Sequence, residues 1–322
     1  MNGNSKFLLG FLSAVTGAAL WGFSGSCAQY LTQHCGVHPI FLTAFRSSIA
    51  ILFFFLAMTW RRRKVVRAGK VFVGPFHTIF KNKRTIRGYF LFSVSLGVDQ
   101  FAYSAAVAYT NAGTATVLQM LSAVIVMVIT CFILKKLPAT REVSALFLAI
   151  IATVVISTQG DLGSVVLPAL GLFWGILNAF ACAGYIMFPK YTGLFDAIGS
   201  FASVACGTLI CAIGGWIVLA CLQMAGIDCL GAVSNLEVQD WLIAVFGLAF
   251  TGTFLAFALY VRGVSMVGPV VGSLLGAVEP VSAAVLSFLW LGTDFTMWDS
   301  CGLVLMVIML VLTSVKKQNS SC

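Results

Sequence analysis

Apolar residues form long unbroken runs along the chain, and short polar segments separate them. The runs predict ten helices, at residues 8–31, 39–60, 88–109, 112–134, 142–159, 168–189, 196–224, 240–263, 267–291 and 297–315. Most runs reach the roughly 20 apolar residues that an α-helix needs to cross a bilayer. The runs are continuous rather than alternating, which argues against a transmembrane β-barrel. The pattern therefore predicts an all-α integral membrane protein with ten transmembrane helices.

The composition supports this fold class and narrows the chemistry. Of 322 residues, 60% are apolar and 9% are charged, whereas about 25% of the residues in a soluble domain are charged. The ten cysteines include no CxxC pair and mostly lie inside apolar runs, which favours a packing role for them. The sequence lacks the HExxH, GxSxG, P-loop and dinucleotide-binding motifs. We therefore expect no enzyme activity, catalytic residue, metal or cofactor.

The distribution of charge predicts the topology. The net charge of +9 suits either a nucleic-acid partner or the basic cytoplasmic loops that membrane proteins carry. With the N-terminus placed in the cytoplasm, the loops expected inside hold 18 of the 19 Lys and Arg residues, and the loops expected outside hold none. This segregation predicts a multi-pass protein of the plasma or inner membrane with both termini cytoplasmic. It removes the reason to expect nucleic acid.

Residues 61–88 are expected to form one long cytoplasmic loop. Ten basic residues flank the apolar stretch VFVGPFHTIF there. Such a segment can lie in the membrane interface, where anionic lipid headgroups attract it. It can equally be a linker behind a basic cluster that stops translocation. The sequence leaves both interpretations open.

The two halves of the chain share a pattern. Residues 111–156 and 265–312 both show a small-residue entry, an apolar helix, a short polar break and a second apolar helix. We therefore divide the chain into two five-helix repeats, residues 1–160 and 161–322. Because five is odd, the second repeat is inverted in the membrane relative to the first. Inverted repeats are typical of transporters.

Short motifs add a family resemblance. They are Ala19-Leu20-Trp21-Gly22, Arg46, Gly276-Ala277-Val278-Glu279-Pro280-Val281 and Leu291-Gly292. With ten helices in two inverted halves, the chain resembles the EamA-type members of the drug/metabolite transporter superfamily over residues 8–315. The resemblance implies a carrier of amino acids or other small metabolites, mostly outward. Sugar-phosphate and nucleotide-sugar carriers are more distant members of that superfamily.

Three ionisable residues lie clearly inside predicted helices: Arg46, Asp99 and Glu279. Each costs about 2.5–3.5 kcal/mol to insert, so each needs a reason to be there. Asp99 is followed by Gln100, and Tyr103 lies one turn further on. This group predicts a site for a substrate amino group or a proton; a structural hydrogen bond between helices is the alternative.

Arg46 and Glu279 each have more than one interpretation. Arg46 can pair with Asp99 or Glu279, hold a substrate carboxylate through two hydrogen bonds, or reach outward to the interface. Glu279 precedes Pro280, which should kink the ninth helix near the middle of the membrane. The Glu279 carboxylate then either contacts substrate or protons, or belongs to a hinge.

Uncharged residues complete the candidate site. Three polar or aromatic residues inside helices are candidates for lining a substrate pocket: Trp21, Gln119 and Asn178. Three glycines recur every four residues in the ninth helix and predict close packing of another helix: Gly268, Gly272 and Gly276.

These features predict a secondary transporter that works by alternating access. We favour export of small organic metabolites, with amino acids or related zwitterions as substrates and proton coupling as a hypothesis. One alternative is a carrier of phosphorylated or nucleotide-linked metabolites, although such anions favour several basic residues in the membrane and only Arg46 is available. A membrane sensor that transports nothing is another. The oligomeric state stays open.

Overall fold

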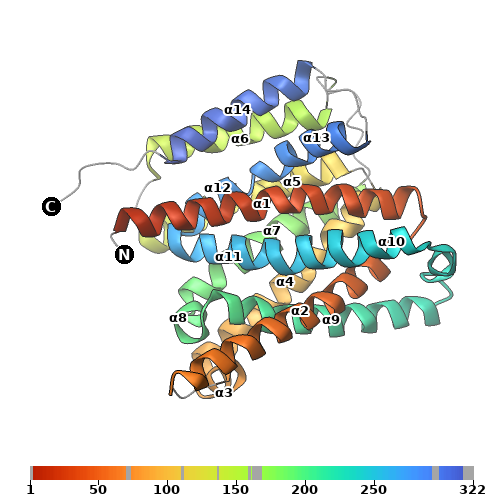
Figure 1. Cartoon of the computed structure of the whole chain (residues 1–322). Coiled ribbons are helices and arrows are strands. Elements are labelled where there is room, and N and C mark those ends of the chain that lie inside the picture. The colour runs from red at the N-terminus through yellow and green to blue at the C-terminus, as the bar shows by residue number, and fades with distance from the viewer. Residues whose placement is uncertain are drawn as a thin grey trace.

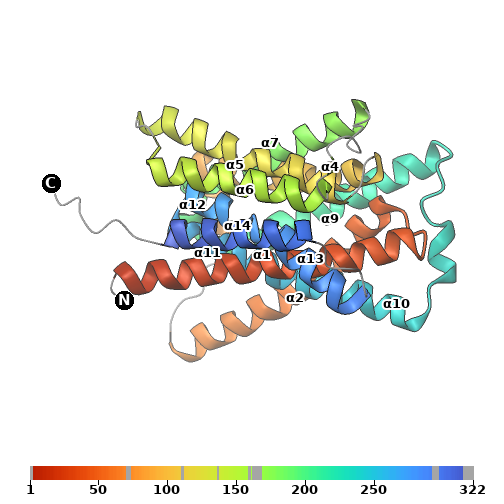
Figure 2. The same ribbon diagram turned by 90° about the horizontal axis from the view of Figure 1, so that it is seen from above.

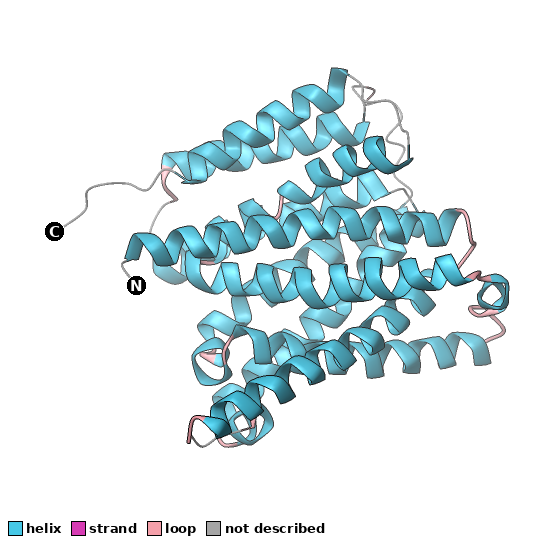
Figure 3. Cartoon of the chain, in the orientation of Figure 1, coloured by secondary structure: helices cyan, strands magenta, loops and turns pink. Residues whose placement is uncertain are grey.

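The computed structural model describes residues 3–69, 74–109, 112–135, 138–158, 161, 169–291 and 297–314. Helices and the turns between them account for this part of the chain, and it contains no strand (Figure 3). The long helices run side by side in one bundle (Figures 1 and 2). We call its two ends the α3 end, where the N-terminus, α3 and α8 lie, and the α10 end opposite.

The elements follow the predicted runs closely. In the first half they are α1 (Gly3–Gln33), α2 (Pro39–Arg67), α3 (Pro75–Phe80), α4 (Lys83–Tyr109), α5 (Ala112–Leu134) and α6 (Thr140–Thr158). In the second half they are α7 (Ala169–Tyr191), α8 (Leu194–Ile198), α9 (Ser200–Met224), η2 (Gly231–Asn235), α10 (Val238–Leu242), η3 (Ile243–Leu255), α11 (Ala256–Val267), α12 (Pro269–Leu275), α13 (Val278–Leu291) and α14 (Met297–Ser314). Within the described ranges, five stretches are long and apolar enough to cross a membrane: Asn4–Thr32, Pro39–Arg67, Ala169–Tyr191, Ser200–Met224 and Val238–Val267.

The predicted loop at residues 61–88 is wrong in its bounds. Helix α2 continues through the basic run to Arg67, and α4 already begins at Lys83. The run RRRKVVR contains no glycine or proline, and basic side chains are favourable in the last turns of a helix. Helix α2 ends at Arg67 with Ala68 as its C-cap, and Gly69 follows with a φ of 70°, which suits glycine. The connection is therefore residues 68–82, in which α3 is the described helix.

Helix packing repeats between the two halves. The most extensive contact of the first repeat with the second, α4 on α7, has a counterpart in α11 on α1. Likewise α5 on α7 matches α13 on α1, and α4 on α9 matches α2 on η3. Exchanging the halves also maps the pairs α2–α9 and α6–α14 onto themselves. A two-fold pseudo-symmetry between two five-helix repeats produces this reciprocal pattern.

The ninth predicted helix is broken one turn earlier than expected. We expected a kink at Pro280, but α12 ends at Leu275 and α13 begins at Val278. The Glu279 N–H donates to the Gly276 carbonyl at 3.0 Å in the connecting turn. A proline ring clashes with the carbonyl four residues earlier, which here is Gly276. Pro280 lies in the first turn of α13, where its missing N–H needs no partner.

The three glycines of this segment lie in different settings. Gly268 has a φ of 97° and forms the turn between α11 and α12. A Cβ on Gly272 would lie 2.7 Å from Val264 Cγ2, so this residue lets α12 pack closely on α11. A Cβ on Gly276 would lie 3.0 Å from the Tyr260 hydroxyl.

Small residues also bring α1 against η3 and α11. A Cβ on Gly17 would lie 2.7 Å from Tyr260 N, and one on Gly263 would lie 2.5 Å from Ala14 N.

Helix η3, which also packs on α1, has wide π turns. The hydroxyl of Thr253 donates a hydrogen bond to the Leu248 carbonyl, five residues earlier, at 3.1 Å. Such wide turns are rare and often occur at functional sites. The hydropathy pattern does not predict this close contact of α1 with η3 and α11.

Candidate functional site

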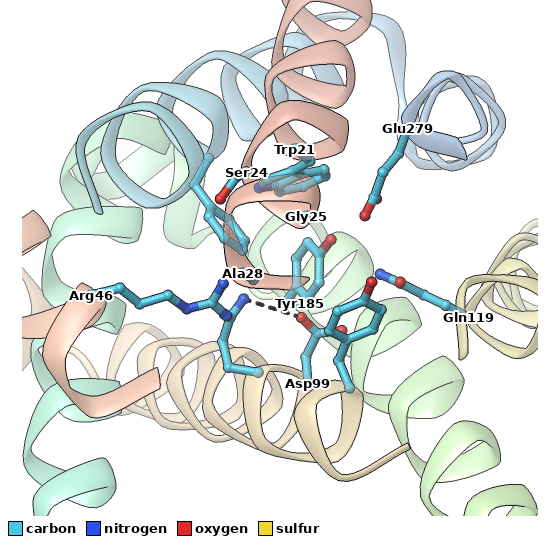
Figure 4. A pocket seen from close by; sticks show the side chains of 12 residues that line it. Trp21, Ser24, Gly25, Ala28, Arg46, Asp99, Gln119, Tyr185 and Glu279 are labelled. Atoms are coloured by element: carbon cyan, nitrogen blue, oxygen red, sulfur yellow. Dashed lines mark hydrogen bonds between the residues drawn. The ribbon is translucent and has the colours of Figure 1, made fainter. Parts of the chain in front are cut away.

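A cavity of about 60 Å³ lies between helices of both halves. It is lined by Trp21, Ser24, Gly25, Ala28, Arg46, Asp99, Gln100, Tyr103, Gln119, Tyr185, Phe257 and Glu279 (Figure 4). Seven of the eight residues that the sequence suggested for substrate binding or coupling are in this set. The eighth, Asn178, lies directly behind it. The structure therefore brings together residues that are up to 258 positions apart in the chain.

The three charged residues reach the cavity from three helices. Arg46 extends from α2, Asp99 from α4 and Glu279 from α13, and Figure 4 shows their side chains directed toward a common space. Among the residues that the structure describes, none of the three forms an ion pair within 4.0 Å. Arg46 and Asp99 thus line the same cavity without forming a salt bridge with each other. One cation and two carboxylates are available to groups that enter it.

Hydrogen bonds hold Asp99 in place. Asn178 on α7 donates from Nδ2 to Asp99 Oδ1 and to the Asp99 backbone carbonyl, each at 2.9 Å. Gln100 Nε2 lies 3.5 Å from Asp99 Oδ2. Asn178 is fully buried and Asp99 is 4% exposed. Asn178 is therefore a positioning residue that ties α4 to α7, rather than a residue of the cavity wall.

Several polar atoms here lack partners. In the described part of the chain, Arg46 Nε, Gln100 Oε1, Gln119 Oε1 and Asn178 Oδ1 are buried and make no hydrogen bond. A buried polar group without a partner costs about 1–3 kcal/mol. Three of these atoms belong to residues that line the cavity. Donors and acceptors on a bound molecule would satisfy them, which makes the cavity a candidate binding site.

Aromatic rings form another part of the wall. The Trp21 ring lies 4.7 Å from that of Phe257 and 4.5 Å from that of Tyr260. Tyr260 donates its hydroxyl to the Gly272 carbonyl at 2.9 Å, which fixes α11 against α12. Tyr185 is 2% exposed and its ring lies 6.1 Å from Phe257. The cavity thus offers apolar surface beside its charges.

Five residues of this wall were not among those selected from the sequence, namely Ser24, Gly25, Ala28, Tyr185 and Phe257. Tyr185 carried a signal, because it is a polar aromatic residue inside an apolar run. Phe257 carried none, because the chain has 27 phenylalanines. Ser24, Gly25 and Ala28 are small residues of the kind that ordinary helix packing uses.

The cavity lies deep within the bundle. Arg46 is seven residues from the start of α2, and Asp99 is ten residues from the end of α4. At helical rise these positions are about 10 Å and about 15 Å from the α10 end. The lining combines α1, α2, α4 and α5 with α7, α11 and α13. Transporters with inverted repeats bind substrate near the midplane, between the repeats.

A family model decides the classification. The model of the EamA-like transporter family matches residues 8–158 and 169–315, one match in each half. The chain belongs to the EamA-like transporter family. It is therefore a transmembrane transporter, and nothing in the family assignment points to an enzyme.

Other comparisons agree with this assignment. The chain is 32% identical over 306 residues to the inner membrane transporter YicL of Salmonella typhimurium, itself described as uncharacterized, and the match covers 95% of each protein. A crystal structure of another protein shares the fold, with a TM-score of 0.69, 15% identity and 96% coverage of both chains. The likeness to an inner membrane protein supports a multi-pass protein of the plasma membrane.

Proposed function

We propose that this EamA-like transporter exports small organic zwitterions, with amino acids foremost, by alternating access. The observation that carries the proposal is the charge pattern of the cavity. One guanidinium and two carboxylates face a common space between the repeats and form no ion pair with one another. A zwitterion brings one charge of each sign to such a site.

The chemistry of each group suits one end of the substrate. The planar guanidinium of Arg46 can hold a carboxylate through two parallel hydrogen bonds. Asp99 and Glu279 are acceptors for an ammonium group. The rings of Trp21 and Phe257 offer apolar contact for a side chain.

The same charges disfavour the rival substrates. A phosphorylated metabolite would bring about two negative charges next to two carboxylates and a single basic side chain. Like charges at close range repel in a medium of low polarity. A zwitterion suits this cavity better than a phosphate or a nucleotide-linked sugar does.

The volume of the cavity bears on the transport cycle. About 60 Å³ gives room for a few water molecules, each of which needs about 10–15 Å³ of such space. In an alternating-access cycle we expect the helices that line this site to move when substrate enters and leaves. The break between α12 and α13 and the wide turns of η3 are suited to such movement, because their backbone is not held in a regular α-helical ladder.

Protons are the proposed coupling ion. A carboxyl in a site without a fixed counter-ion can carry a proton when no ammonium group is bound. We assign this role to Asp99, which lies deeper than Arg46. Release of substrate on one side and of a proton on the other would then alternate at one cavity.

Uptake into inside-out membrane vesicles tests the proposal. Vesicles with and without the protein are given a mixture of amino acids and phosphorylated metabolites, with and without a proton uncoupler, and mass spectrometry measures the contents. We expect amino acids to accumulate only with the protein and only without the uncoupler. Asp99→Asn should lose the uncoupler-sensitive accumulation, whereas Asp228→Asn, which removes a carboxylate in the exposed turn before η2, should keep it. Accumulation of phosphorylated compounds, or of nothing, would contradict the proposal.

A further inference from the structure

A second, larger cavity lies at the α3 end of the bundle, away from the charged site. Its volume is about 400 Å³, and parts of α2, α3, α8 and α9 surround it. The wall combines polar side chains with apolar ones, among them Met58, Val65, Phe195 and Phe201. Such a space is large enough for a phospholipid headgroup together with the first part of an acyl chain.

One basic side chain reaches into this wall. The guanidinium carbon of Arg61 lies 5.2 Å from the centroid of the Phe201 ring, a cation–π contact that holds the charge at the cavity. Asp196 also lines the cavity. Within the described ranges, Arg61 and Asp196 form no ion pair with each other or with other residues. Arg61 therefore remains available to an anion.

More basic residues lie at the same end of the bundle, on two of the neighbouring helices. The last turns of α2 carry Arg62, Arg63, Lys64 and Arg67, and the first turns of α4 carry Lys83, Arg84 and Arg87. All of these side chains are exposed. Arg84 Nη2 donates to the Tyr191 carbonyl at 3.0 Å, which brings the start of α4 next to the end of α7. The α3 end of the bundle is therefore strongly positive near this cavity.

Apolar side chains cover the adjacent outer surface. Phe55, Leu56 and Trp60 on α2 are each more than 60% exposed, as is Phe80 on α3. Lys64 Nζ lies 5.4 Å from the Trp60 ring. Aromatic and basic side chains together are typical of the headgroup level of a bilayer. The cavity thus lies near both exposed basic side chains and an exposed apolar surface.

We propose that this cavity binds the headgroup of an anionic phospholipid, with its phosphate on Arg61 and an acyl chain along the exposed face of α2. Arginine matches phosphate oxygens through paired hydrogen bonds. Basic clusters beside a transmembrane helix attract anionic lipids. Of the two interpretations of the basic segment that the sequence left open, this site favours the interfacial one.

Lipid binding to the purified full-length chain tests the proposal. The protein is kept in an uncharged detergent, and native mass spectrometry measures bound phosphatidylglycerol against phosphatidylcholine. We expect phosphatidylglycerol to bind preferentially. Arg61→Gln should weaken its affinity about fivefold or more, whereas Lys6→Gln, which removes one exposed charge from α1 near the same end, should leave it within about twofold.

A cavity-filling variant separates this site from general surface charge. Met58→Trp keeps every charge and narrows the space, so it should also lose the bound lipid. Equal effects of Arg61→Gln and Lys6→Gln would indicate non-specific attraction and overturn the proposal. Unchanged binding by Met58→Trp would do the same. In the last experiment, glycerol phosphate at millimolar concentration is tested as a ligand. If it binds as tightly as the lipid, the cavity is a site for soluble phosphate compounds and not for a lipid headgroup.

Discussion

Asn178 on α7 donates two hydrogen bonds to Asp99 on α4, one to its carboxylate and one to its backbone carbonyl, each at 2.9 Å. These two helices belong to different repeats and pack extensively on each other. The bond therefore joins the repeats at the carboxylate to which we assign the coupling role. It explains why an asparagine lies fully buried in an apolar helix.

Replacing Asn178 should impair both stability and transport. Asn178→Ala removes the donor that Asp99 Oδ1 and the Asp99 carbonyl share, at a cost of about 1–3 kcal/mol of unfolding free energy. Thermal unfolding in detergent measures the loss, and vesicle uptake measures transport. Asn235→Ala, at an exposed position of η2, is the control. Wild-type stability and uptake in Asn178→Ala would show that the bond does not position Asp99.

Arg46 should distinguish substrates by their carboxylate. Arg46→Lys keeps the charge but loses the paired hydrogen bonds, so we expect the affinity for an amino acid to fall about tenfold, equivalent to about 1.4 kcal/mol. Arg46→Gln should abolish uptake. Arg262→Gln, at an exposed position of α11, is the matched control. If Arg46→Gln transports amino acids with an unchanged KM, the guanidinium does not hold the substrate.

Two glycine substitutions test the close packing of α1 on α11. A Cβ on Gly263 would lie 2.5 Å from Ala14 N and 2.6 Å from the Gly10 carbonyl oxygen, whereas Gly214 on α9 has open space around it. Alanine stabilises a helix by up to about 1 kcal/mol relative to glycine. Gly214→Ala should therefore leave the melting temperature unchanged or raise it, and Gly263→Ala should lower it. The same shift in both variants would contradict the packing.

His38 should make stability depend on pH at the α10 end. Its Nδ1 accepts a hydrogen bond from Ile40 N at 3.3 Å and caps α2, and burial lowers its pKa from 6.5, while the nearby charge of Asp228 opposes that shift. The unfolded chain therefore binds a proton on His38 at a higher pH than the folded chain does. The contribution of His38 to the free energy of unfolding is complete above pH 6.5 and is lost as the pH falls through the folded-state pKa. His38→Asn keeps the cap and should remove this part of the decline in thermal unfolding between about pH 7 and pH 5. Identical pH profiles of thermal unfolding for the wild-type protein and His38→Asn would show that His38 does not cause the pH dependence.

The sequence predicted the helices and most of the cavity for a physical reason. Charged and amide side chains are costly in apolar helices, so Arg46, Asp99, Gln119 and Glu279 stood out from their surroundings. The structure places all four at one cavity. Hydropathy likewise identified the helices, because long apolar runs occur in few structures other than membrane-spanning helices.

What the sequence did not predict has one cause in contacts between distant segments and others in local backbone geometry and helix propensity. The approach of Gly263 to Ala14 depends on pairing between helices almost 250 residues apart. The break at Gly276 rather than at Pro280 depends on which carbonyl the proline ring would meet. The extension of α2 to Arg67 was not predicted from hydropathy. A run of basic residues has the low hydropathy of a loop, although lysine and arginine form helices readily.

Counterflow in proteoliposomes of the purified protein tests the central claim most directly. Vesicles loaded with an amino acid mixture are offered one labelled amino acid, its N-acetyl derivative or its decarboxylated amine, and exchange into the vesicles is measured. Recognition by Arg46 together with Asp99 and Glu279 predicts rapid exchange of the zwitterion and slow exchange of both derivatives. Exchange of the N-acetyl derivative or the amine as fast as that of the amino acid would contradict zwitterion recognition by this cavity.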